Sequence, residues 1–300
     1  MNAYVVAFDI GGSKAHLVVE TLERKRVVDE RIPSYDWDAE PAENGAAWLV
    51  GKLRRHVPSD GSIASLALGA QGVDSAATAE NLALALARHG YRATVVNDAA
   101  LVVAAAGFED GVGIIAGTGA IGVGRDRSGR SLLTGGWGCV IGDEGGAAAL
   151  VREATRAALR AHDEATLDDG LLGALLRAFA VANAERLARK VNDEPTAENW
   201  APRCPAVFAA ADAGSTLAAK VIGAGARALA VLVDQLLARG AVGTDVVAAG
   251  GVIVNQERLF GAFAQSLRAR HPELKAHKLA VAPVEGALAL ARKKLSAAAP

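Results

Sequence analysis

A tight glycine turn between two apolar strands occurs twice in this chain, about a hundred residues apart. The first copy is predicted at residues 4–9, 10–14 and 15–20, and the second at residues 113–116, 117–119 and 121–125. Repetition on this scale predicts two similar lobes rather than a solenoid, whose repeats are shorter. The chain has 300 residues, which is enough for two separate hydrophobic cores.

The segments around these two copies predict an α/β protein. Further strands are predicted at residues 25–32, 63–68, 93–96 and 246–249, and helices at residues 44–56, 76–89, 99–106, 255–269 and 283–297. Residues 145–240 are almost wholly helical in pattern, with one irregular loop at 192–205 that contains three prolines.

These elements predict a division of the chain into two lobes. We expect an N-terminal lobe of residues 1–107, to which a C-terminal helix at 283–300 returns. A C-terminal lobe of residues 108–282 is expected to carry a helical insertion at about 150–240.

Composition and charge narrow the class of function. The formal net charge is −1 and no Lys/Arg-rich run is present, so the chain lacks the electrostatic footprint of a nucleic-acid binder. The N-terminus has no basic leader, and no run of about 18 apolar residues is free of charges and turns. Cys139 and Cys204 are isolated, and the six histidines show no metal-ligand spacing. We expect a cytoplasmic protein with no nucleic-acid or membrane partner.

The first glycine turn follows a carboxylate at the end of a strand. Asp9 offers an anchor for hydrated Mg²⁺, beside backbone N–H groups of Gly11, Gly12, Ser13 and Lys14 that can face a phosphate. The turn is neither a Walker A loop nor a Rossmann fingerprint, because a strand follows it. An ordinary β-hairpin is the alternative interpretation of this turn taken alone.

The second turn favours a nucleotide site. Gly117 and Gly119 expose backbone N–H groups, and Thr118 adds a hydroxyl donor. Two such hairpins from two lobes are expected to close on the β- and γ-phosphates of one ATP molecule. A third glycine pair, Gly250-Gly251, follows a strand and lets a flat adenine lie against the backbone; a plain strand-to-helix connection is equally consistent with it.

Asn97-Asp98 lies where a predicted strand ends and a helix begins. One interpretation is a helix N-cap, where both residue types are favoured. The functional interpretation is that Asp98 accepts, or orients, the proton of an attacking sugar hydroxyl. Phosphoryl transfer asks little of a base beyond positioning the nucleophile, so one aspartate suffices.

Residues 135–146 are unusually rich in glycine and contain one indole and two acids. Asp143 and Glu144 lie just before a predicted helix, where they would interact favourably with its dipole. We favour a functional interpretation, in which a carboxylate accepts two sugar hydroxyls while Trp137 or backbone amides border the sugar ring.

Taken together, these motifs resemble the actin-like ATPase superfamily of sugar kinases, Hsp70 and actin. Within it the chain is similar to the N-acetylglucosamine kinase family, which also contains ATPase activators of benzoyl-CoA-type reductases. The GGWGxxxGDEG stretch at 135–145 is the most specific motif. The resemblance implies a two-lobed α/β fold, a duplicated ribonuclease H-like unit with a cleft between the lobes, and use of ATP and Mg²⁺.

The resemblance also implies a role for individual residues. Asp98 corresponds to the catalytic base, and Asp9 to the metal anchor. The implied sugar-binding residues are Asp36, Gln71, Asn97, Gly136, Trp137 and Asp143. The implied nucleotide-binding residues are Gly11, Gly12, Ser13, Lys14, Gly117, Thr118, Gly119, Gly250, Gly251 and Asn255.

Two questions stay open at this point. Asp36, Asp38 or Asp74 would pair with a protonated amine, which favours glucosamine over N-acetylglucosamine; solvated acidic side chains are the alternative explanation. A nucleotide-switched ATPase that acts on a protein partner is the competing function class. Two isolated cysteines argue against the reductase activators, and a missing CxCGxxGC zinc segment argues against the bacterial repressor/kinase group. A homodimer is expected from base rates alone.

Overall fold

The computed structural model describes residues 2–11 and 14–298, so Gly12 and Ser13 of the first turn lie outside the described residues. The chain divides into two compact units, each assembled from separate segments. The first unit comprises Met1–Gly111, Gly124–Ser131 and Leu279–Pro300, and the second comprises Val112–Val123 and Leu132–Lys278.

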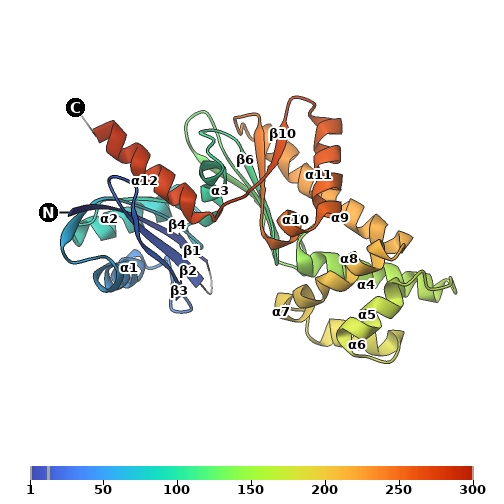
Figure 1. Cartoon of the computed structure of the whole chain (residues 1–300). Helices are drawn as coiled ribbons and strands as arrows, with labels where there is room; N and C mark the ends of the chain where they lie inside the picture. Colours follow the sequence, from blue (N-terminus) through green and yellow to red (C-terminus); the bar gives the residue numbers. More distant parts are fainter. Residues whose placement is uncertain (1, 12–13, 299–300) are drawn as a thin grey trace. The chain divides into compact units, whose positions relative to one another are not determined.

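The first unit is built on a five-stranded mixed sheet (Figure 1). Its strand order is β3-β2-β1-β4-β5, in which β1, β4 and β5 are parallel and β2 is antiparallel to both neighbours. The strands are β1 (Asn2–Ile10), β2 (Lys14–Thr21), β3 (Arg26–Pro33), β4 (Gly61–Ala70) and β5 (Ala93–Asn97). The helices are α1 (Ala42–His56), α2 (Ala76–Arg88), η1 (Asp98–Ala100), α3 (Leu101–Ala105) and α12 (Val284–Ala298).

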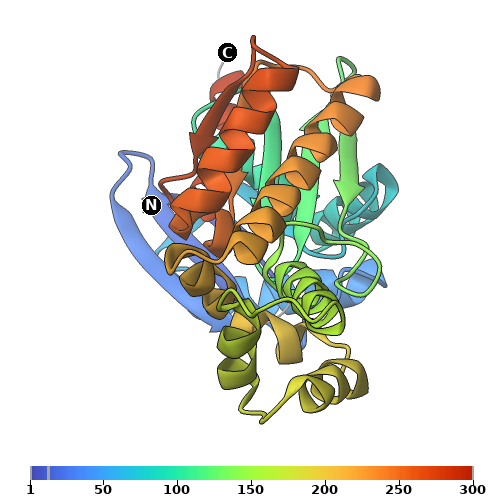
Figure 2. The same ribbon diagram turned by 90° about the vertical axis from the view of Figure 1, so that its right-hand side faces the viewer.

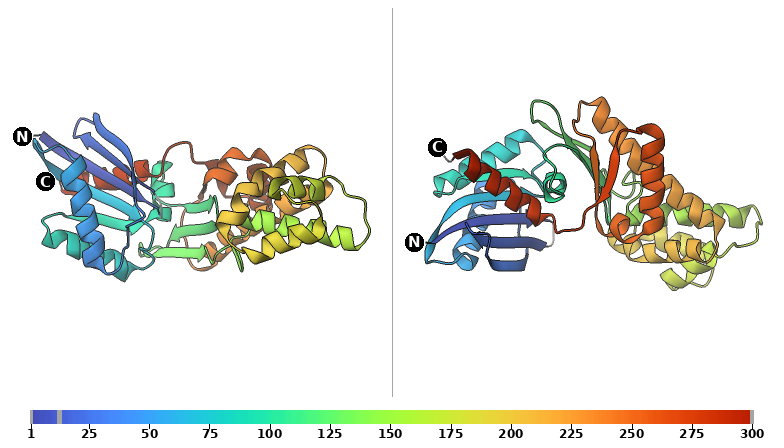
Figure 3. Two further views of the ribbon diagram at one scale, coloured as in Figure 1. Left: turned by 90° about the horizontal axis from the view of Figure 1, so that it is seen from below. Right: turned by 45° about the horizontal axis from the view of Figure 1, so that its top comes forward.

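Both faces of this sheet are covered. Val6 and Phe8 of β1 point into a core that includes buried residues of α1 and α2, whereas Val5 and Ala7 contact the residues of α3 and α12. Figures 1 and 3 show α12 on one side of the sheet, with α1 and α2 on the other. Because successive strand side chains point to opposite faces, a strand buried on both faces needs an unbroken apolar run. The sequence YVVAF of β1 is such a run.

The second unit is built on the other five-stranded sheet. Its strands are β6 (Val112–Ala116), β7 (Ala120–Arg125), β8 (Ser131–Gly135), β9 (Asp245–Ala249) and β10 (Lys275–Lys278). Its helices are α4 (Ala147–Asp163), α5 (Leu171–Phe179), α6 (Ala184–Asp193), α7 (Ala197–Trp200), η2 (Ala201–Arg203), α8 (Cys204–Asp212), α9 (Thr216–Ala238), α10 (Gly251–Asn255) and α11 (Glu257–Arg270). Figure 2 shows α9 and α11 side by side across one face of the sheet.

The two sheets share one topology. The order β8-β7-β6-β9-β10 matches β3-β2-β1-β4-β5 strand for strand, with β6, β9 and β10 parallel and β7 antiparallel to β6. The two glycine turns therefore occupy equivalent places, between the first and second strand of each sheet. The repetition seen in the sequence is a repetition of the whole sheet, and the α/β fold class is confirmed.

Some predicted elements were wrong or missing. The segment 192–205 was predicted to be irregular, but it contains α7 and η2 and begins α8. Pro202 and Pro205 lie in the first turns of η2 and α8, where the missing proline N–H costs no hydrogen bond. The short strands β8 and β10 were not predicted. The sequence of β10, Lys-Ala-His-Lys, shows no apolar alternation.

Helix α9 is the one helix in the described part of the chain that is long and apolar enough to cross a membrane by length and composition. In the structure Ile222, Leu229 and Val233 of this helix are buried in the hydrophobic core of the second unit. A core helix of a folded domain passes the same test of length and composition.

One carboxylate links the starts of two helices in the second unit. The Asp169 carboxylate accepts hydrogen bonds from Leu171 N (3.3 Å), Leu217 N (2.9 Å) and Ser215 Oγ (2.9 Å). Partial burial alone would raise the pKa of Asp169, but these hydrogen bonds lower it below its ordinary value. Ser215 in turn accepts from Ala218 N and caps α9. Asp169 therefore stabilises the N-termini of α5 and α9 together.

Replacing Asp169 by Asn is expected to lower the free energy of unfolding at pH 7 by about 1–2 kcal/mol, because charge-assisted hydrogen bonds to two helix starts are weakened. A depressed folded-state pKa contributes stability above the unfolded pKa of about 3.9 and loses it as pH falls through the folded value. Urea unfolding should therefore show a difference at pH 7 that narrows below about pH 4. Asp193→Asn, at the exposed end of α6, is the control and should shift stability little. An Asp169→Asn deficit that persists unchanged at low pH would contradict this assignment.

Candidate active site

In the first unit, the predicted site residues lie at the carboxyl ends of parallel strands. Ile10, Ala70 and Asn97 are aligned across β1, β4 and β5, and Gln71 N donates to Ile10 O (2.8 Å). Asp9 therefore lies one residue before this row, and Asp98 one residue after it. Ligands of α/β proteins bind outside the carboxyl ends of the strands, so the structure groups these residues at an edge suited to binding.

Asp98 belongs to a small polar network. Asn97 Nδ2 donates to Asp74 Oδ1 (3.0 Å) and to Val73 O (3.2 Å), and Asn97 Oδ1 accepts from Ala99 N (3.0 Å). Asn97 thus caps η1 and holds Asp74 beside the site. Burial raises the pKa of Asp98, the Ala99 N–H lowers it, and the negative charge of Asp74 raises it again, so that the net pKa lies above its ordinary value.

Asp9 is the second carboxylate at this edge. Burial, together with the negative charge of Asp98, raises the pKa of Asp9 to about 7. Two like charges that share a poorly solvated edge disfavour each other's ionised form. A bound cation or a hydrogen-bond donor from a ligand would therefore stabilise the ionised form of these two carboxylates.

The first glycine turn starts directly after Asp9 and Ile10. Gly11 N donates to Lys14 O (3.0 Å), and Gly11 O accepts from the buried Ser34 hydroxyl (2.7 Å). Gly11 and Lys14 are therefore placed at the turn as predicted, with Lys14 exposed at the start of β2. Gly12 and Ser13 lie outside the described residues, and their predicted contacts with phosphate stay predictions.

The loop 34–38 is hydrogen-bonded to Gln71 through the indole of Trp37. Trp37 Nε1 donates to Gln71 O (3.0 Å), and its ring packs edge-to-face on Trp48. Asp36 accepts from Trp48 Nε1 (2.8 Å), and this hydrogen bond lowers the pKa of Asp36. Asp38 Oδ1 accepts from Glu40 N (3.1 Å). All three acidic residues considered for an amine partner, Asp36, Asp38 and Asp74, therefore already accept hydrogen bonds from the protein.

In the second unit, the turn 117–119 is bound to the start of α4. Ala147 N donates to Gly117 O (2.8 Å), and Ala148 N donates to Thr118 O (3.2 Å). The first N–H groups of α4 are thus used within the protein and do not remain for a ligand. Thr118 is exposed at the tip of the turn, which leaves its hydroxyl accessible.

Asp143 lies against this turn. It adopts a left-handed φ of 60°, and its Oδ1 accepts from Gly138 N (3.2 Å). A Cβ on Gly119 would lie 2.3 Å from Asp143 Oδ2, and a Cβ on Gly146 would lie 2.6 Å from Gly119 C. Gly119 and Gly146 are therefore required for close packing, a reason the sequence did not reveal.

The Asp143 side chain is not placed as a cap of α4. The N-cap of α4 is Gly146, whose N–H donates to the Asp143 main-chain oxygen (2.9 Å). Burial raises the pKa of Asp143, backbone N–H groups of Gly138 and Ala120 lower it, and the charge of Glu144 raises it, with a net rise. Next to it, Gly136 has a φ of 74° and Trp137 is 75% exposed. An exposed indole and a half-buried carboxylate are thus presented side by side along one loop.

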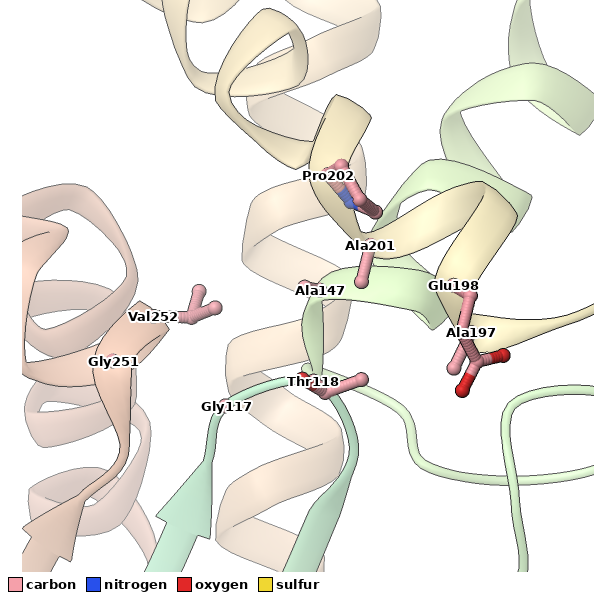
Figure 4. Close-up of a pocket in the computed structure, with 9 residues that line it drawn as sticks. All are labelled: Gly117, Thr118, Ala147, Ala197, Glu198, Ala201, Pro202, Gly251 and Val252. Atoms are coloured by element: carbon pink, nitrogen blue, oxygen red, sulfur yellow. The ribbon is translucent and has the colours of Figure 1, made fainter. Parts of the chain in front are cut away.

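A pocket of about 610 Å³ lies wholly within the second unit (Figure 4). It is lined by Gly117, Thr118, Ala147, Ala197, Glu198, Ala201, Pro202, Gly251 and Val252. Figure 4 shows Val252 on one side, Ala201 and Pro202 opposite, and Thr118 at the floor. Apolar walls beside the glycine turn 117–119 suit a nucleotide, whose base is apolar on its faces and whose phosphates need hydrogen-bond donors. Three of the predicted nucleotide-binding residues, Gly117, Thr118 and Gly251, line this pocket.

Two other predicted residues have structural roles beside the pocket. Gly250 has a φ of 96°, and a Cβ there would lie 2.5 Å from Ala116 O, so only glycine fits. Asn255 Nδ2 donates to Gly251 O (2.7 Å) within α10. Sequence reasoning missed Glu198 and Pro202, because α7 and η2 were taken for an irregular loop that carries no chemical motif.

Removing the Asp9 carboxylate is expected to stabilise the ligand-free protein at high pH. A folded-state pKa raised from about 3.9 to about 7 contributes stability below pH 4, and that stability is lost as pH rises through about 7. Asp9→Asn cannot ionise, so at pH 8 its free energy of unfolding should exceed that of the parent by roughly 2–4 kcal/mol, with no advantage at pH 4.

Chemical unfolding at both pH values measures this difference. Asp110→Asn, an exposed aspartate in the loop after α3, serves as the matched control and should show no such pH dependence. Equal free energies of unfolding of the Asp9 variant and the parent at pH 8 would show that the folded state does not disfavour the ionised Asp9 carboxylate.

Comparisons with known proteins show the family to which the chain belongs. Residues 9–291 match the BadF/BadG/BcrA/BcrD ATPase family. The chain is 28% identical over 304 residues to an N-acetylmuramic acid/N-acetylglucosamine kinase of Clostridium acetobutylicum, an alignment that covers 97% of this chain and 99% of that protein. It is 25% identical over 312 residues to an N-acetyl-D-glucosamine kinase of Dictyostelium discoideum, with 95% and 97% covered.

Solved structures show the same fold. A putative N-acetylglucosamine kinase from Chromobacterium violaceum aligns with a TM-score of 0.69 at 20% identity, over 96% of this chain and 98% of that chain. A ROK family glucokinase from Streptomyces griseus aligns with a TM-score of 0.57 at 17% identity, over 97% and 98%. The predicted resemblance and the actin-like fold class are confirmed, and the chain belongs to the BadF/BadG/BcrA/BcrD ATPase family.

Proposed function

We propose that this protein transfers the γ-phosphoryl group of ATP to the 6-hydroxyl of an amino sugar. The observation that carries the proposal is Asp98, a half-buried carboxylate of raised pKa that lies beside Asp74 and near Asp9 at the carboxyl edge of a sheet. Perturbed carboxylates of this kind concentrate at catalytic sites. Relatives of similar length that are named sugar kinases support the same reaction.

The roles follow from placement. Asp98 orients the sugar hydroxyl and accepts its proton as the phosphoryl group transfers, since a raised pKa makes the carboxylate a better base. The turns that contain Gly11 and Thr118 supply donors for the phosphates, and the pocket beside Gly251 takes the adenosine. Trp137 and Asp143 border the sugar ring.

A magnesium ion fits the donors that the chain offers. In the part of the chain that the structure describes, no group of three or more His, Cys, Asp or Glu side chains is placed to hold a metal. Mg²⁺ that is held chiefly by phosphates and water needs only one or two carboxylates, and Asp9 is suited to that role. When bound, the ion would neutralise charge on the phosphates.

The choice of sugar is the finer part of the proposal. Both named relatives act, by their names, on N-acetylated sugars, and Asp36 and Asp38 already accept hydrogen bonds from the protein. N-acetylglucosamine is therefore our leading substrate. Glucosamine, which the acidic loop favoured, stays as the second candidate because Asp74, although it accepts from Asn97 Nδ2, is exposed beside Asp98 and suits a protonated amine.

Replacing Asp98 by Asn is expected to lower kcat by about 10²- to 10⁴-fold, because the group that orients and accepts the proton is lost. The dissociation constant for ATP should stay nearly unchanged, since Asp98 does not contact the nucleotide in this proposal. Coupled detection of ADP and calorimetric titration measure the two quantities. Glu80→Gln, on the exposed face of α2, should leave both unchanged. Near-normal turnover by the Asp98 variant would remove it as the base.

A panel of sugars tests the substrate and the function class together. ADP release should depend on sugar, with N-acetylglucosamine preferred over glucosamine and glucose, and a 6-deoxy analogue should not be phosphorylated. A clear preference for glucosamine that falls in Asp74→Asn would select the second candidate. ATP hydrolysis at the same rate without any sugar would contradict the kinase and support a nucleotide-switched ATPase that acts on a protein partner. A cytoplasmic location and a homodimer remain predictions, which fractionation and light scattering would check.

A further inference from the structure

The loop between β8 and α4 is held from behind by one guanidinium. Arg152, in the second turn of α4, directs Nη1 to the main-chain oxygens of Cys139 and of Gly142, the latter at 3.2 Å. Its side chain is 14% exposed, although it carries a charge. A buried guanidinium that donates to carbonyls is a built contact rather than a solvated charge.

The two carbonyls that Arg152 binds lie on the two sides of one tight turn. Gly142 N donates to Gly138 O (2.8 Å) and closes this turn, whose tip exposes Val140 and Ile141. Glu153 Oε1 accepts from Arg152 Nε (2.8 Å), and Glu144 lies 3.8 Å from Nη2. The two carboxylates balance the buried charge and fix the plane of the guanidinium.

The residues that the proposed function places at the sugar are attached to this turn. Asp143 follows Gly142 directly, and its Oδ1 accepts from Gly138 N (3.2 Å), so both of its anchors belong to the segment that Arg152 holds. Asp143 also adopts a left-handed φ of 60°, a conformation that the surroundings must impose on a non-glycine residue. Trp137 precedes Gly138 in the same segment.

We propose that Arg152 is a positioning residue that sets the Asp143 carboxylate and the Trp137 indole for sugar binding. The inference rests on the proposed function, because it gives Asp143 a ligand. Arg152 itself lies beneath the loop and acts through the two carbonyls. Nη1 donates to both carbonyls while Nε of the same rigid plane donates to Glu153. An ammonium is a single point donor that cannot keep all three bonds in this geometry, so lysine does not replace the guanidinium fully.

The test compares Arg152→Ala and Arg152→Lys with Arg156→Ala. Arg156 lies one turn further along α4 and pairs with the same Glu153, but it is exposed. The alanine variant should raise KM for the sugar by about 10- to 100-fold while KM for ATP stays within about 2-fold, since only the sugar loop is displaced. The lysine variant should fall between the alanine variant and the parent, and Arg156→Ala should match the parent.

Two further readouts separate positioning from general stability. Guanidinium ion at a non-denaturing concentration should partly restore the sugar KM of Arg152→Ala and leave Arg156→Ala unchanged. If Arg152→Ala does not fold, Arg152→Lys decides the matter, because it keeps the charge and most of the stem. A sugar KM in Arg152→Lys equal to that of the parent, or a proportional change of both KM values, would overturn the proposal.

We call the contacts of Arg152 with the carbonyls of Cys139 and Gly142 the clamp. Failure of the proposed clamp and failure of the proposed kinase function give different experimental results. A parent enzyme that phosphorylates sugar, with Arg152 variants of unchanged sugar KM, overturns only the clamp. A parent enzyme that turns over no sugar refutes the proposed function. In that case hydrogen exchange at residues 138–143 still tests the clamp: faster exchange in Arg152→Lys than in Arg156→Ala supports it, and equal exchange overturns it.

Discussion

The second unit is organised by a contact that leaves no room for a side chain. Gly119, Asp143 and Gly146 approach so closely that a Cβ on either glycine would overlap its neighbours. The carbonyls of the turn accept the first N–H groups of α4, and Gly145 packs against Leu229 of α9. Because protein interiors are close-packed, a turn held this tightly moves only with its helix. The turn 117–119 and the loop 135–146 thus share one rigid support, and fixed relative positions of this kind are what the proposed phosphoryl transfer would require.

In the first unit the corresponding constraint is electrostatic. Asp9, Asp98 and Asp74 gather at one sheet edge, where burial and neighbouring negative charge raise the pKa values of Asp9 and Asp98. The sheet withstands this repulsion because apolar helices cover both of its faces. In the proposed function, a cation and a substrate bound at these carboxylates would offset the unfavourable charge, so that stability of the ligand-free protein and activity make opposite demands on them.

The sequence predicted what depends on local pattern. The structure and the comparisons confirm the apolar strands around the glycine turns, the α/β class and the family resemblance. These features could be predicted because hydrophobic pattern and glycine placement depend on residues that are close together in the sequence. The strand β10 was missed because its four residues, Lys-Ala-His-Lys, show no apolar alternation, and its backbone pairing with β9 leaves no mark in the sequence. Asn97 and Asp98 were both candidates for a cap, and the structure gives Asn97 as the N-cap of η1, although Ala99 N donates to both side chains.

Long-range contacts were invisible in the same way. Nothing in the sequence joins Arg152 to the carbonyls of Cys139 and Gly142, because main-chain acceptors leave no mark in the residue type. The reason for glycine at 145 and 146 was equally hidden, because each packs against a neighbour from another segment. The candidate site residues of the first unit follow strand ends that the sequence predicted, but the side chains that support them came only from the fold.

The placement of α12 has a consequence for how the protein is made. Val284, Leu288 and Ala291 cover the sheet face formed by Val5, Ala7 and Ala67, and Arg292 pairs with the buried Glu20. Ribosomes add roughly 5–20 residues per second, so this face waits about 10 to 40 s between the completion of β5 and the emergence of its cover. During that interval the nascent chain presents a bare apolar surface, the kind of surface that chaperones bind. A premature stop before residue 284 would leave the same surface permanently open and would mark the product for degradation.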